Sequence, residues 1–188
     1  MGGFLGGWGA MRAAPCDTAA MSTLTQQAAR LEQAAAELEG LRTRIEAGAP
    51  WALTDVYGPG PESAWGPREV LAHVAEMLPY WMGEIERILD GADGEPVPFG
   101  RTEADPVRVA IIGRDRTMPA RELLSRIAAD ANRVAGRLRE LSAAEGQREG
   151  LHPTRGPLAV TEIVERFQVG HLEGHVTQLR EALAVSDG

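Results

Sequence analysis

The chain has 188 residues, with 27 acidic and 19 basic side chains and a formal net charge of −8 at pH 7 when histidine is neutral. This length suits one domain that buries a hydrophobic core without disulfide bonds or a metal to hold it together. The acidic balance, with no block of consecutive lysine or arginine, argues against a nucleic acid or a membrane surface as a partner.

The first 21 residues differ in character from the rest of the chain. Met1 to Trp8 is apolar, but the first basic residue, Arg12, follows this run, whereas a secretory signal places basic residues before it. Cys16 is the only cysteine, which excludes an internal disulfide and favours a reducing cytoplasm. We expect residues 1–21 to be a disordered extension or an upstream mis-assigned start, and residues 22–185 to form the domain.

Apolar residues at helical spacing predict a first amphipathic helix from Thr23 to Ala47, which Gly48 and Pro50 end. A connection rich in glycine and proline then leads to a second helix, predicted from Pro67 to about Leu89 because proline suits the first helical position. Pro79 lies inside this helix and removes a backbone hydrogen bond, so a kink is expected there.

Two more long helices follow. Residues Pro106 to Arg114 predict a short extra helix, and Thr117 to Leu141 a third long one. After a polar, glycine-rich loop at Ser142 to Pro157, a fourth helix runs from Thr161 to Leu183. Composition and periodicity therefore predict an all-α four-helix bundle. The connection from Asp90 to Arg116 is long enough for a crossover between parallel helices.

Three of the four histidines lie on the inward faces of predicted helices, His73 on the second and His171 with His175 on the fourth. The pair is four residues apart, so both rings rise from one helix face roughly 6 Å apart. Imidazoles in an apolar stripe are costly to bury unless their ring nitrogens are satisfied, which a metal does directly. Three nitrogen ligands with open positions are typical of a catalytic site. The alternative is a set of core histidines bonded to side chains or water.

Other metal motifs do not fit the spacing. Glu173 occupies the third place of the sequence from His171 to His175, whereas a zinc protease has glutamate directly after its first histidine. A di-iron bundle needs Glu-x-x-His on two helices, and the only such spacing, Glu149 to His152, falls in a glycine-rich loop. We expect His152 to be exposed there, with an approach to the mouth of the site as the alternative.

Three segments together resemble the DinB-like superfamily: Trp65 to His73, Pro157 to Thr161, and Phe167 to His175. The likeness covers most of Thr23 to Leu183. In that family a Trp-x-Pro-x-Glu stretch opens the second helix and leads to a histidine ligand. A His-x-x-x-His pair in the last helix supplies the other two ligands.

Carried over to this chain, the resemblance assigns His73, His171 and His175 as ligands of one divalent metal ion, zinc or nickel. It also implies a four-helix bundle in up-down-down-up order. Characterised relatives include thiol transferases and isomerases that use bacillithiol, mycothiol or glutathione. The implied activity is a metal-dependent thiol S-transferase acting on an electrophilic small molecule, since an ion with open positions lowers the pKa of a bound thiol.

Two non-catalytic interpretations stay open. One is a stress-response or scaffolding bundle whose metal is structural or vestigial, and the other is a binding module for a small apolar ligand. An intact set of three histidines favours the enzyme, because a degenerate site would be expected to have lost a ligand.

Two polar residues share helix faces with the histidines. Tyr80 lies seven residues after His73, and Gln178 seven after His171, which places each nearly above its histidine. We expect both to border the metal or a bound cofactor, and packing roles are the alternative.

The first helix carries Ala29, Ala36 and Leu41 beside its main apolar stripe, more than one core face requires. The resemblance implies homodimers as well. We therefore expect a two-fold symmetric homodimer, with each metal site inside one subunit because all three ligands come from one chain.

Overall fold

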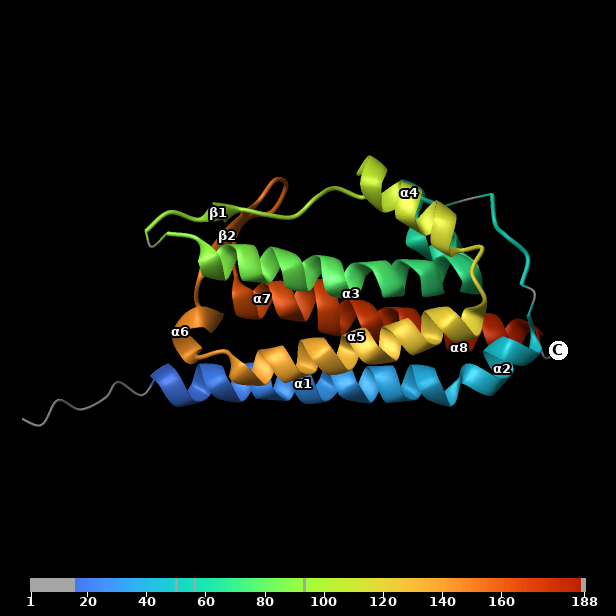
Figure 1. The fold of residues 1–188 in the computed structure, drawn as a ribbon, viewed down its shortest axis with the longest axis horizontal. Coiled ribbons are helices and arrows are strands. Elements are labelled where there is room, and N and C mark those ends of the chain that lie inside the picture. Colours follow the sequence, from blue (N-terminus) through green and yellow to red (C-terminus); the bar gives the residue numbers. More distant parts are fainter. Residues whose placement is uncertain (1–15, 50, 56, 93, 187–188) are drawn as a thin grey trace, which may run out of the picture.

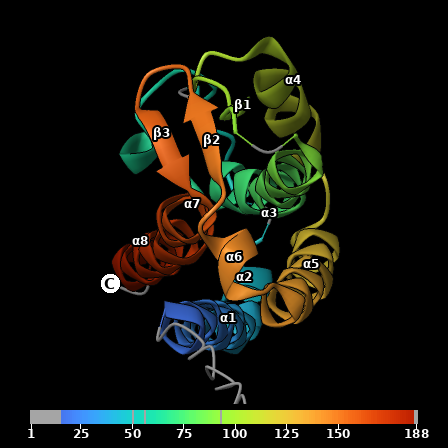
Figure 2. The ribbon, with the colours of Figure 1, turned by 90° about the vertical axis from the view of Figure 1, so that its left-hand side faces the viewer.

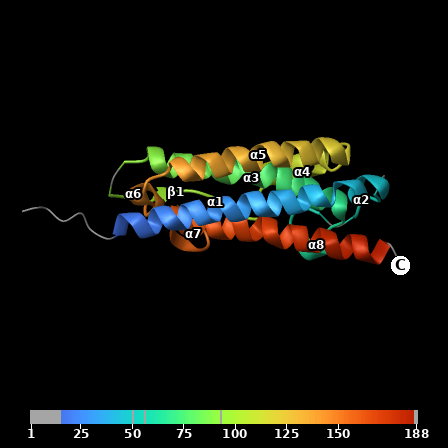
Figure 3. The same ribbon diagram turned by 90° about the horizontal axis from the view of Figure 1, so that it is seen from below.

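Four long helices lie side by side around the core in the structure, a computed structural model that describes residues 16–49, 51–55, 57–92 and 94–186. Their bounds are Cys16–Gly40 for α1, Pro67–Asp90 for α3, Ala120–Glu140 for α5 and Gly170–Ser186 for α8. The all-α helical bundle is therefore confirmed. The colours of Figure 1 show α1 and α8 running in one direction and α3 and α5 in the other, and Figure 3 shows the same four rods from below. This is the up-down-down-up order.

The first helix differs from its predicted bounds at both ends. The described helix already includes Cys16, before the predicted start at Thr23, and it ends at Gly40, after which a separate short helix, α2, covers Arg42–Ala47. Glycine weakens a helix, and Leu41 turns inward at this point and is buried, so the two segments are joined by a bend. Residues 1–15 of the expected extension lie outside the described residues.

The last helix is built in three pieces: α7 at Val160–Val164, a π-helical turn, η2, at Glu165–Val169, and then α8. In an α-helix, residues spaced by four drift about 40° around the axis at each step. A π-helical turn takes up an extra residue, which offsets this drift. Phe167 and His175, eight residues apart, are accordingly both buried on the inward side.

Shorter elements fill the connections. They are η1, a 3₁₀ turn at Glu62–Ala64, β1 at Val97–Pro98, α4 at Pro106–Asp115, α6 at Ala143–Gly146, β2 at Glu149–His152 and β3 at Gly156–Ala159. The predicted extra helix between the second and third long helices is confirmed as α4. The second helix, α3, runs through Pro79 without interruption.

The predicted polar loop at Ser142 to Pro157 contains a β-hairpin. Strands β2 and β3 pair antiparallel, with Gly150 opposite Leu158, and β1 adds to β2 in parallel. The tight turn needs Gly156, whose φ of 76° is unfavourable for other residues. Four-residue strands carry too little periodicity to be seen in the sequence. The pairing of β2 with β1, which precedes it by about fifty residues, depends on the fold.

The hairpin and α4 lie on the same side of the bundle, above α3 (Figure 2). Together they cover the region where α3 and the last helix meet. Within the part of the chain that the structure describes, no helix combines the length and apolar character needed to cross a membrane.

Candidate metal centre

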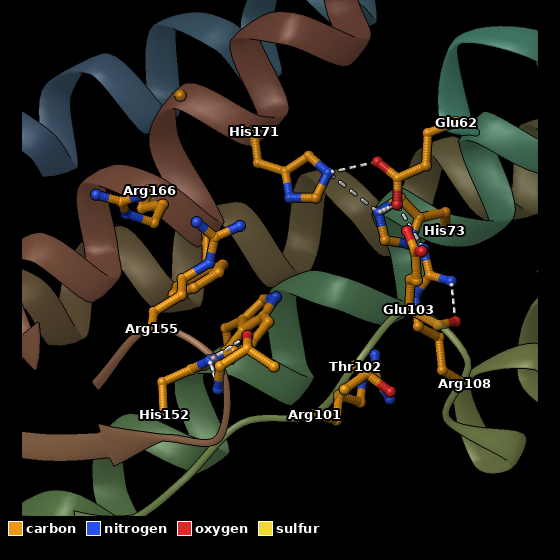
Figure 4. Close-up of a pocket in the computed structure, with 14 residues that line it drawn as sticks. Glu62, His73, Arg101, Thr102, Glu103, Arg108, His152, Arg155, Arg166 and His171 are labelled. Carbon is orange, nitrogen blue, oxygen red and sulfur yellow. Dashed lines mark hydrogen bonds and ion pairs between the residues drawn. The ribbon is translucent and has the colours of Figure 1, made fainter. Parts of the chain in front are cut away.

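Four side chains from three elements converge between α3 and α8: His73, His171, His175 and Glu62, the last from the 3₁₀ turn η1 (Figure 4 shows three of them). One ligand atom of each lies within 4.8 Å of the others. The Nε2 atoms of His73 and His171 are 3.3 Å apart, and Glu62 Oε2 lies 3.1 Å from His171 Nε2. Metal–nitrogen bonds of about 2.0–2.1 Å in a tetrahedral arrangement place ligand atoms about 3.3 Å apart. The spacing thus suits one ion.

The orientation of Gln178 fixes the tautomer of His175. The Gln178 amide nitrogen donates to the backbone carbonyls of Glu62, at 2.7 Å, and Trp65, at 3.3 Å, so its oxygen must face His175. That oxygen lies 2.9 Å from His175 Nδ1, which therefore carries the proton and donates. The lone pair of His175 is then on Nε2 and points into the cluster.

Among the described residues, this lone pair meets no hydrogen-bond donor. His175 Nε2 is buried without a hydrogen-bond partner, and its near neighbour is a second acceptor, Glu62 Oε2, at 3.6 Å. A cation bound between two such buried acceptors satisfies both of them. The donor set of three imidazoles and a carboxylate suits zinc or nickel, so these residues fit a divalent ion.

Burial keeps the imidazole rings of His73 and His175 in the neutral form that binds a metal. It lowers the pKa of His175 to about 4, and the neighbouring His171 acts in the same direction. Burial likewise lowers the pKa of His73 well below the usual range, with contributions from His171 and His175. Both rings are therefore neutral at pH 7, the form in which imidazole binds a metal.

A second carboxylate stands behind His73. The Nδ1 atom of His73 lies 3.9 Å from Glu76 Oε2, too far for a hydrogen bond, and in the described part of the chain neither buried atom has a hydrogen-bond partner. Arg101 holds the other oxygen of Glu76. Burial raises the pKa of Glu76 against the opposing effect of Arg101. This is the place of the outer carboxylate that commonly orients a metal-bound histidine.

Glu62 was not among the residues that the sequence singled out. It lies in the connection rich in glycine and proline, on a three-residue 3₁₀ turn without a periodic pattern. Arg108 of α4 holds it in place: the guanidinium binds Glu62 Oε1 at 2.5 Å and donates to the carbonyls of Gly58 and Glu103. Although burial raises the pKa of Glu62, the hydrogen bond with His171 and the nearby positive charges outweigh it and lower the pKa overall.

A cavity of about 720 Å³ opens beside the cluster, between α3, the segment before α4, the hairpin and the last helix. His73 and His171 are among its lining residues, and the side chain of His171 is 25% exposed. One wall consists of the rings of Trp81 and Phe167, stacked with centroids 4.2 Å apart. This volume is of the size that holds a small-molecule ligand.

The expectation that His152 is exposed was wrong. It is buried, lines the cavity, and stacks on Phe167 with centroids 5.4 Å apart. The cause is the hairpin, which brings β2 against Phe99 and the preceding residues. Gly100 makes room for the ring, since a Cβ there would lie 2.6 Å from His152 Cδ2. His152 lies at the cavity as the alternative interpretation had it, outside the group of four that could hold an ion.

Tyr80 and Gln178 have different positions. Gln178 contacts His175 and the backbone of Glu62, directly behind the cluster. Tyr80 does not line the cavity; its ring packs under the guanidinium of Arg101, 3.6 Å from the ring centroid, and that arginine does line it. Tyr80 therefore reaches the cavity only indirectly, through Arg101 and through Trp81, whose ring centroid lies 4.9 Å from its own.

Comparison with protein families matches residues 23–179 to the DinB superfamily. The chain therefore belongs to the DinB superfamily, as the resemblance of its histidine segments indicated. The curated proteins include no match to this chain.

Removing the hydrogen bond to His175 is expected to weaken metal binding without abolishing it. Gln178→Ala leaves the ligands in place but frees the His175 ring to rotate and to change tautomer. Losses of this kind lower metal affinity by about 10- to 100-fold. Competition with a chelator of known affinity measures the effect. Gln168→Ala, a buried glutamine outside the cluster, is the matched control, and equal affinities for parent and Gln178→Ala would contradict the assigned role.

Proposed function

We propose that this chain is a divalent-metal-dependent transferase, in which His73, His171 and His175 hold one zinc or nickel ion and a low-molecular-weight thiol attacks an electrophilic small molecule. The observation that carries the proposal is the buried lone pair of His175 Nε2, which faces a carboxylate and no donor. The single cysteine, Cys16, fits a cytoplasmic protein.

In this proposal, the ion and the residues around the cluster have separate roles in the reaction. A bound divalent ion supplies the Lewis acid that lowers the pKa of a coordinated thiol. Glu62, whose pKa is lowered, is ionised at pH 7, and its carboxylate would accept the thiol proton when it is not itself a ligand of the ion. Arg108 holds the same carboxylate through Oε1, and Gln178 fixes the ring of His175. The Trp81 and Phe167 wall excludes water from one side of the cavity.

A thiol-transfer assay tests this function. Protein loaded with zinc or nickel is incubated with bacillithiol, mycothiol or glutathione in turn, and with a chromogenic aryl halide as electrophile. We expect one thiol to react faster than its uncatalysed rate, and chelator treatment to remove the acceleration. Glu62→Gln should lower kcat and flatten its pH profile, because an amide cannot take the proton. Equal rates with loaded and chelator-treated protein for all three thiols would exclude the proposal.

Glu62 also favours a second candidate, a non-catalytic bundle with a structural metal. If its carboxylate takes the fourth ligand position, the site is closed, as structural zinc sites are. The absorption spectrum of the cobalt-loaded protein separates the two functions. A spectrum that shifts on adding a thiol indicates an exchangeable position and a catalytic site, and one that does not respond indicates a closed structural site.

We also propose a homodimer. Ala29 and Ala36 are exposed on α1, whereas Leu41 is buried in the core, so the surplus apolar surface is smaller than the sequence suggested. With the three histidines in one chain, each subunit would keep its own site. Sedimentation equilibrium at micromolar concentration should give twice the monomer mass, and a single species at the monomer mass would contradict the dimer.

A further inference from the structure

The cavity beside the metal centre is lined by basic side chains in an acidic protein. Four arginines line it, against two glutamates, although the whole chain has a net charge of −8. The arginines are Arg101, Arg108, Arg155 and Arg166, and the glutamates are Glu62 and Glu103. The lining therefore carries an excess of positive charge, before any metal ion is added.

Two of these arginines have structural partners. Arg101 pairs with Glu76 and Arg108 with Glu62, and the two guanidinium groups are almost fully buried. These pairs hold the segment before α4 against α3 and position the carboxylate of Glu62. Their charges are largely balanced inside the protein, so they are not the groups that await a ligand.

The other two have no such partner. Among the described residues, no hydrogen bond or ion pair engages the guanidinium of Arg155 or of Arg166. Arg155 comes from the turn between β2 and β3, and Arg166 from the π-helical turn η2. Figure 4 shows both on the side of His171 that faces away from Glu62. The hairpin turn and the π-helical turn, which are close in the sequence, thus bring two cations to one end of the cavity.

An apolar surface runs from these arginines toward the cluster. The rings of Trp81, Phe167 and His152 are stacked within 30° of parallel, and the Arg155 guanidinium lies 5.7 Å from the Phe167 centroid. The positive charge of Arg155, after burial, also contributes to lowering the pKa of His152. An aromatic lining with two cations beside it suits a molecule that has a planar or apolar body and an anionic end.

We infer that Arg155 and Arg166 form an anion-binding subsite, so that the substrate of this site carries a carboxylate or a phosphate group. The anionic end is held by the two guanidinium groups, the body lies on the Trp81 and Phe167 wall, and the reactive end reaches His171. This inference names a substrate class for the proposed function and rests on it for the direction of the substrate. The anion subsite itself does not depend on a bound metal.

Isothermal titration calorimetry of the metal-free protein tests the subsite with three small aromatic probes of one shape: benzoate, phenylphosphonate and neutral benzamide. We expect at least one of the two anions to bind at least tenfold more tightly than benzamide. The tighter anion identifies a carboxylate or a phosphate group. The double variant Arg155→Gln/Arg166→Gln should lose at least tenfold in affinity for that anion and leave benzamide unaffected.

Arg121→Gln/Arg133→Gln is the matched control, because it removes the same charge from two exposed arginines outside the cavity. It should bind the anion as the parent does. Equal affinity for benzamide and both anions, or an unchanged affinity in the Arg155 and Arg166 variant, would overturn the inference. The affinity of the parent protein for zinc and nickel is measured separately. If the parent binds the anion but no metal, only the proposed function is contradicted. If it binds the metal but shows no preference for the anions, only the subsite is contradicted.

Discussion

Alanine in place of His175 is expected to weaken divalent-metal binding at least about 100-fold, because losing an outer hydrogen bond to a ligand already costs 10- to 100-fold and here the ligand itself is lost. The parent should bind close to one ion per chain. The change removes the buried Nε2 lone pair that faces Glu62. We expect the substitution to leave the rest of the core intact, because the neighbouring buried side chains of Leu172, Val176 and Leu179 are unchanged. Chelator competition with zinc and with nickel measures the affinities.

His152→Ala is the control for this experiment. His152 is a buried histidine of the same cavity, but it is not in the group whose ligand atoms meet. We expect its metal affinity to stay within a few-fold of the parent. Circular dichroism on both variants checks that the helices are kept. If His175→Ala and His171→Ala bind metal as tightly as His152→Ala does, the ion is held elsewhere and the assigned ligands are wrong.

The metal-free protein is expected to lose stability as the pH falls from about 6.5 to about 4. In the unfolded chain His175 takes up a proton near its ordinary pKa of about 6.5, whereas in the folded protein its pKa is about 4. Between these values the unfolded state binds more protons, so the free energy of unfolding decreases as the pH decreases. The contribution of His175 is about 3 kcal/mol. It is fully present above pH 6.5 and lost at pH 4, and His73 acts in the same direction.

Urea denaturation at intervals between pH 7 and pH 4 measures this dependence. His175→Asn, which keeps a polar side chain but does not titrate, should show a slope smaller by about 3 kcal/mol over the same range. Metal-loaded protein should keep its stability to lower pH, because the ion competes with the proton for Nε2. Parallel profiles for the parent and His175→Asn would show that His175 is not held neutral in the fold.

The helical bundle and three of the four converging side chains, His73, His171 and His175, could be predicted from the sequence, because the prediction needs only the periodicity within each helix. A helix repeats every 3.6 residues, so the spacing of apolar residues determines which side chains face inward. His73 and His175 lie in such stripes and are buried as expected. The exact ends were less predictable, as the end of α1 at Gly40 instead of Ala47 shows, because a helix end depends on local capping and on contacts beyond the pattern.

Only the tertiary structure decided the rest of the site. Glu62 lies on a turn of three residues, and its place beside the histidines depends on Arg108, which is 46 positions further along the chain. Arg155 and His152 come to the cavity through a hairpin of four-residue strands, too short for a periodic signal. Periodicity assigns a face within one element, whereas the meeting of separate connections is set by packing between residues far apart in the sequence. For that reason the sequence determined the imidazoles, and the fold determined the carboxylate and the cations around them.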